Sequence, residues 1–103
     1  MNPIIKNKLS EVAELCVKRQ VRRLELFGSA AREDFEQGRS DLDLLVEFLP
    51  MTPAQRANNF FGLMADLKQL LGTEIDLLEP EPIRNPYFKQ AIEQNKVVLY
   101  EAA

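Results

Sequence analysis

The chain has 103 residues, of which 46% are hydrophobic and 28% charged, and this balance fits one globular domain over residues 1–103. Its formal net charge of −3 argues against a protein that coats nucleic acids, because phosphate backbones attract concentrated Lys and Arg. No apolar run approaches the roughly 20 residues of a membrane span, so no membrane partner is expected.

Residue types that are rare in this chain exclude several chemistries. The sequence contains no histidine, which excludes Ser-His-Asp and Cys-His catalysis and imidazole-based zinc sites. Any metal must therefore be held mainly by oxygen, as magnesium, manganese and calcium are. The single cysteine, Cys16, falls on an apolar helical stripe and is interpreted as a buried structural thiol. One cysteine permits no internal disulfide, and this suits the cytoplasm.

The first half of the chain predicts two helices and two strands. Apolar residues at helical spacing predict a helix over residues 3–19, and "VRRLELF" predicts a strand over residues 21–27 that ends at Gly28. A short helix over residues 30–36, a turn over residues 37–40 and a second strand over residues 41–48 follow. The basic cluster "KRQVRR" lies where the first helix meets the first strand, and we interpret it as a solvated helix end and turn, with a phosphate or partner contact as the alternative.

The second half repeats the alternation of helix and strand. Thr52, Pro53 and Gln55 form a helix start with a capping box, and Gly72 is a C-terminal stop. The apolar stripe of this helix is expected at Phe60, Met64, Leu67 and Leu71, flanked by Phe61, Leu63 and Leu70. A strand over residues 73–79, a helix over residues 85–94 and a strand over residues 96–101 complete the chain. The predicted fold is α/β, a small mixed β-sheet of about four strands with helices packed on it.

Three acids occupy positions in or beside predicted strands. Because side chains alternate along a strand, Asp41 and Asp43 share one face, and apolar neighbours occupy the other. Asp76 lies in a similar strand, "EIDLL", and joins the other two acids if the strands are neighbours in register. Two adjacent carboxylates repel each other unless a cation lies between them. The alternative for Asp76 alone is a strand residue that faces water.

A possible phosphate site precedes the acidic strand. Gly28 permits close approach of a ligand to the backbone, Ser29 offers a hydroxyl at a helix start, and Arg32 follows on the same helix face. Taken alone, Ser29 is better explained as a helix N-cap and Arg32 as a surface charge. It is the succession of Gly-Ser, Arg and paired acids that favours a nucleotide site.

This succession resembles the DNA polymerase β-like nucleotidyltransferase superfamily, and more closely a minimal nucleotidyltransferase (MNT) domain. The stretches "GSAARED…GRSDLDLLVEF", "EIDLLEP" and "RNPYFKQAIEQNKVVLYEA" carry the resemblance over nearly the whole chain. The family pattern often has a glycine after the arginine, where this chain has Glu33. Glu33 and Asp34 bring negative charge near the proposed phosphate site, and in the first turn of a helix they interact favourably with the helix dipole.

The resemblance implies a role for each matching residue. Gly28, Ser29 and Arg32 would bind the triphosphate of ATP, and Asp41, Asp43 and Asp76 would hold two Mg²⁺ ions and form the catalytic site. Asp76 would also help to activate the acceptor hydroxyl as a general base.

The resemblance also implies a partner. Stand-alone MNT proteins act as antitoxins beside a HEPN-type ribonuclease toxin, and they transfer AMP from ATP to a toxin tyrosine. A second hypothesis is a binding module that neutralises its partner by contact, with exposed parts of Phe60, Phe61, Tyr87 and Phe88 as anchors. Substitution of Asp41 and Asp43 by Asn would separate the two hypotheses.

Overall fold

The computed structural model describes residues 3–27, 42–80 and 96–103. It contains helices α1 (Pro3–Lys6), α2 (Leu9–Lys18) and α3 (Pro53–Leu71), and strands β1 (Val21–Phe27), β2 (Leu42–Phe48), β3 (Ile75–Leu78) and β4 (Val97–Glu101). The predicted helices over residues 30–36 and 85–94, and the predicted turn over residues 37–40, lie outside the described residues. Within the described ranges, no helix is long and apolar enough to cross a membrane.

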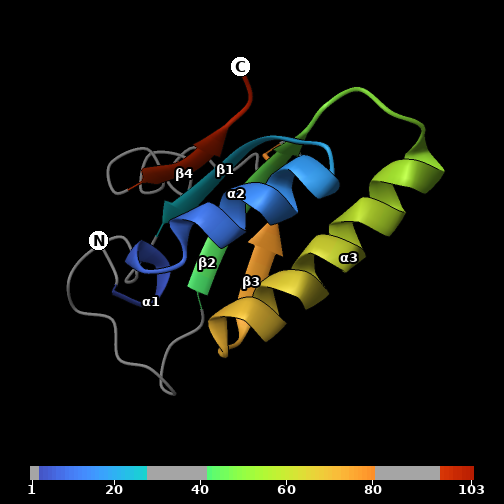
Figure 1. Ribbon diagram of the computed structural model, residues 1–103. Helices are drawn as coiled ribbons and strands as arrows, with labels where there is room; N and C mark the ends of the chain where they lie inside the picture. Colours follow the sequence, from blue (N-terminus) through green and yellow to red (C-terminus); the bar gives the residue numbers. More distant parts are fainter. Residues whose placement is uncertain (1–2, 28–41, 81–95) are drawn as a thin grey trace, which may run out of the picture.

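The four strands form one mixed sheet in the order β3-β2-β1-β4. β1 runs antiparallel to both β2 and β4, whereas β2 and β3 run parallel. A parallel pair needs a crossover connection, and α3 supplies it between β2 and β3. In Figure 1, α2 and α3 lie over the same face of the sheet. The prediction of a small mixed sheet with packed helices is confirmed.

Local signals place the ends of α3. The Thr52 side chain accepts a hydrogen bond from the Gln55 backbone N–H at 3.2 Å, and the Gln55 side chain accepts one from the Thr52 backbone N–H at 3.1 Å. This reciprocal pair is the expected capping box. At the other end, Gly72 has a φ of 66°, a left-handed conformation that glycine adopts without steric cost. Both predicted boundaries of this helix are confirmed.

Two helices differ from their predictions. The helix predicted over residues 3–19 is interrupted by a turn at Asn7 and Lys8, so α1 and α2 are separate. The buried face of α3 is centred on Leu63, Leu67 and Leu71, while Phe61 is 64% exposed. Residues four apart lie on one helix face, and the buried series begins at Asn59, one position before the predicted Phe60.

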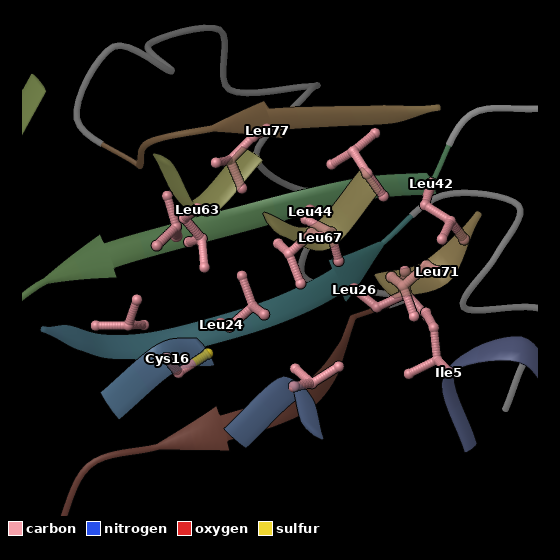
Figure 2. Close-up of a cluster of buried hydrophobic side chains, with 14 residues drawn as sticks. Ile5, Cys16, Leu24, Leu26, Leu42, Leu44, Leu63, Leu67, Leu71 and Leu77 are labelled. Atoms are coloured by element: carbon pink, nitrogen blue, oxygen red, sulfur yellow. The ribbon is translucent and has the colours of Figure 1, made fainter. Parts of the chain in front are cut away.

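The hydrophobic core lies between the helices and one face of the sheet. Leucines of β1 and β2 point from the sheet towards leucines of α3, as Figure 2 shows. The buried residues of this cluster are Ile5, Val12, Cys16, Val21, Leu24, Leu26, Leu42, Leu44, Val46, Leu63, Leu67, Leu71, Ile75 and Leu77. The expected alternation of β2 is confirmed, because Leu42, Leu44 and Val46 all belong to this core.

Cys16 is buried in the core, and burial raises the pKa of its thiol from 9.0 to about 12. The buried structural thiol predicted from the sequence is confirmed.

We expect a thiol reagent to label native protein at neutral pH only as fast as the chain opens, and to label urea-unfolded protein at once. Rapid labelling of one thiol per native chain would contradict this burial.

Because folding raises the pKa of the Cys16 thiol, the unfolded chain loses this proton at lower pH than the folded protein does. The free energy of unfolding should therefore fall as pH rises from about 9 towards 12.

Candidate functional site

The second face of the sheet carries two acids side by side. Asp43 of β2 and Asp76 of β3 are direct partners in the parallel register. Their neighbours Leu42, Leu44 and Leu77 belong to the core, so alternation sends both acidic side chains to the opposite face. Neighbouring strands lie about 4.8 Å apart, so the two carboxylates are close enough to share one ion. The register therefore brings together the two acids that the sequence placed on different strands.

The surroundings of this acid pair suit a charged ligand. Asp43 is half-buried and Asp76 is exposed. Two adjacent carboxylates repel each other, and a divalent cation between them would reduce that repulsion. The donors are carboxylate oxygens, the ligands that Mg²⁺ prefers. The chemistry of this donor set therefore fits a divalent cation held by Asp43 and Asp76.

The other predicted site residues fall between the end of β1 and the start of β2 in the sequence. Asp41 directly precedes β2, and Gly28 directly follows Phe27, the last residue of β1. Phe27 is the register partner of Asp43, so the strand end from which residues 28–41 depart is adjacent to the acids. Gly28, Ser29, Arg32, Glu33 and Asp41 themselves lie outside the described residues. Within the described ranges, no group of three or more acids, cysteines or histidines could hold a metal.

Glu25 is a site-face residue that sequence reasoning missed. It lies on the same face of β1 as Phe27, and its exposed fraction is only 6%. Its Oε2 lies 3.2 Å from the ammonium nitrogen of Lys96, which directly precedes β4. Glu25 interrupts the apolar stretch "LELF" just as Asp43 interrupts "LDLL". The same criterion that singled out Asp43 would therefore have found Glu25.

The basic cluster is paired with acids of α3, β2 and β4. Lys18 and Arg19 contact Asp66 of α3 at 3.8 and 3.0 Å. Arg22 contacts Glu47 at 3.6 Å, and Arg23 contacts Glu101 at 3.0 Å. These pairs support the interpretation of "KRQVRR" as a solvated helix end and turn.

A groove of about 510 Å³ lies between the first turns of α3 and the end of β3. An ion pair between Arg56 and Glu79 forms part of its wall. Phe60 lines the groove, and its ring contacts that of the exposed Phe61 edge-on, with centroids 5.3 Å apart. The remaining lining residues are Met51, Pro53, Ala57, Leu77 and Leu78. Tyr87 and Phe88, the other expected anchors, lie outside the described residues.

The sequence defines the family. The family model for the nucleotidyltransferase domain matches residues 9–99. A Methanocaldococcus jannaschii protein named "Putative protein adenylyltransferase" is 40% identical over 82 residues, which cover 80% of this chain and 80% of that protein. The chain belongs to the nucleotidyltransferase domain family and is a nucleotidyltransferase, as the motif predicted.

Solved structures share the fold. The structure of a "putative minimal nucleotidyltransferase" matches with a TM-score of 0.67 at 26% identity, over 94% of this chain and 95% of that one. A chain in the complex of a tri-AMPylated Shewanella oneidensis HEPN toxin with an MNT antitoxin matches with a TM-score of 0.63 at 15% identity. The match covers 95% of this chain and 73% of that one. The second likeness concerns the fold alone. The resemblance to minimal nucleotidyltransferases is thereby confirmed.

The acid pair makes a metal-dependent prediction for stability. We expect millimolar Mg²⁺ or Mn²⁺ to raise the melting temperature of the protein, because a cation removes the repulsion between Asp43 and Asp76. Asp76→Asn should abolish this rise and leave the melting temperature without metal unchanged or slightly higher. Glu14→Gln, an exposed charge change on α2, should keep the metal response. An equal metal response in Asp76→Asn and the unsubstituted protein would rule out this site.

Proposed function

We propose that the protein transfers AMP from ATP to a hydroxyl group of a partner protein, with Mg²⁺ bound by Asp41, Asp43 and Asp76. The observation that carries this proposal is the register of Asp43 with Asp76 beside the end of β1, where Gly28 and Ser29 follow. The names of the M. jannaschii relatives support adenylyl transfer as the reaction. A nucleotide site needs both an acid pair for the cation and a segment for the phosphates, and the strand end that Gly28 follows in the sequence lies beside the acid pair.

Each residue has a defined task in this reaction. Asp41, Asp43 and Asp76 would hold two Mg²⁺ ions, and these ions would supply electrostatic stabilisation for the charge that develops on the attacking and leaving oxygens. Gly28 offers its backbone to the triphosphate, and Ser29 and Arg32 donate hydrogen bonds to phosphate oxygens. Asp76 accepts the proton of the acceptor hydroxyl. The acceptor oxygen bonds to the α-phosphorus, the bond from that phosphorus to the bridging oxygen breaks, and pyrophosphate leaves.

The partner that we propose is a HEPN-type toxin, modified on a tyrosine and thereby silenced. The support is the shared fold with a chain from a complex of a tri-AMPylated HEPN toxin and an MNT antitoxin. The acceptor chemistry is consistent with this choice, because a tyrosine hydroxyl can deliver its proton to a carboxylate that the metal site orients.

Transfer of label provides the direct test. Purified protein, Mg²⁺, ATP labelled in the α-phosphate and the HEPN-type product of a neighbouring gene should give a labelled partner, with a mass increase of one AMP on a tyrosine. Asp43→Asn and Asp76→Asn should each slow the transfer by roughly a hundredfold or more, because they remove electrostatic stabilisation of the transition state. Glu14→Gln should transfer normally. No label on the partner with the unsubstituted protein would refute the proposed reaction.

A second candidate function is neutralisation of the partner by contact alone. The observation in its favour is the exposed Phe61 beside the apolar groove that Phe60 lines, which is the kind of anchor that protein interfaces use. If Asp43→Asn and Asp76→Asn still silence the partner although label transfer is lost, contact and not chemistry is responsible.

A further inference from the structure

A row of residues crosses the second face of the sheet at the level of the acid pair. Asp76 is the partner of Asp43, and Asp43 is the partner of Phe27. On the far side of β1, Leu26 pairs with Val97 in antiparallel register. In β1, Phe27 is the residue after Leu26. Lys96 is the residue before Val97, so continuation of this antiparallel register brings Lys96 beside Phe27. The acids thus lie at one end of the row and a lysine at the other.

The position of Lys96 is set by a buried acid. The Glu25 side chain is 8% exposed and the Lys96 side chain 28% exposed, and their charged atoms lie 3.2 Å apart. A buried carboxylate requires a compensating charge, so Glu25 draws the ammonium group onto this face of the sheet. The contact lacks hydrogen-bond geometry, and Glu25 Oε2 accepts no hydrogen bond within the described part of the chain. The attraction between opposite charges therefore keeps the Lys96 ammonium group beside Glu25.

We propose that Lys96 binds the terminal phosphates of the nucleoside triphosphate, and that Glu25 is its positioning residue. The inference rests on the proposed function, which places the α-phosphate at Asp43 and Asp76. Two strand spacings put the Lys96 backbone about 10 Å from that of Asp43. A lysine has a flexible four-carbon stem and three donors, so it can span part of this gap and contact Glu25 and a phosphate together. Lys96 then stabilises the charge that accumulates on pyrophosphate as it leaves.

The competing explanation is a structural ion pair that only fastens β4 to β1. The chain contains a matched control for it, because Arg23 and Glu101 join the same two strands through a 3.0 Å contact at the opposite end of the pairing. If fastening were the whole role of Lys96, loss of either pair would have a similar effect on nucleotide binding.

Calorimetric titration with ATP and with AMP, each in the presence of Mg²⁺, tests the inference. Lys96→Met should weaken ATP binding about tenfold, the effect of one charge-assisted hydrogen bond, and leave AMP binding unchanged. The double variant Glu25→Gln with Lys96→Met should bind ATP as weakly as Lys96→Met alone. It leaves no unpaired buried charge that could impair folding. Lys96→Arg should retain most of the ATP affinity, and Arg23→Met all of it.

Three results would overturn the inference. If the double variant binds ATP as tightly as the unsubstituted protein, the role of Lys96 is only structural. An equal loss for ATP and AMP would show that the lysine does not contact the terminal phosphates. Absence of ATP binding by the unsubstituted protein would refute the proposed function together with this inference, whereas normal ATP binding by the double variant would refute this inference alone.

Discussion

The parallel pairing of β2 with β3 determines the proposed chemistry of this protein. The pairing sets Asp43 directly beside Asp76, although 32 positions separate them in the sequence. A shift of either strand by one residue would turn its acid towards the core and its leucines towards the opposite face. Burial of Leu42, Leu44, Ile75 and Leu77 under α3 prevents that shift, so the hydrophobic core also fixes the distance between the acids.

One sheet face therefore provides stability and the other carries the charged residues. The first face and the helices bury a contiguous core, which a 103-residue chain needs if it is to fold at all. The second face carries Asp43, Asp76 and Glu25 with its partner Lys96, together with the small apolar cluster of Phe27 and Leu45. Separation of the two tasks lets the protein keep several charges beside a strand without placing them inside its core.

Sequence patterns predicted much of this arrangement, because several signals are local. The capping box at Thr52 and the glycine at position 72 defined α3, and the alternation of β2 assigned Leu44 and Asp43 to opposite faces. The strand order and the pairing of Asp43 with Asp76 were not contained in any local pattern, since register between distant strands depends on how the whole core packs. The ion pair of Glu25 with Lys96 was missed for the same reason, because β4 reaches β1 only in the folded chain. Of the predicted site residues, Asp43 and Asp76 fall within the described ranges, whereas Gly28, Ser29, Arg32 and Asp41 do not.

We propose that Asp43 and Asp76 together hold one divalent cation. Anomalous diffraction from crystals soaked with Mn²⁺ and a non-hydrolysable ATP analogue tests it most directly. We expect a manganese peak within bonding distance of carboxylate oxygens from both residues, about 2.0–2.2 Å away. A peak bonded to neither residue, or none on this face in crystals that bind the nucleotide, would contradict it.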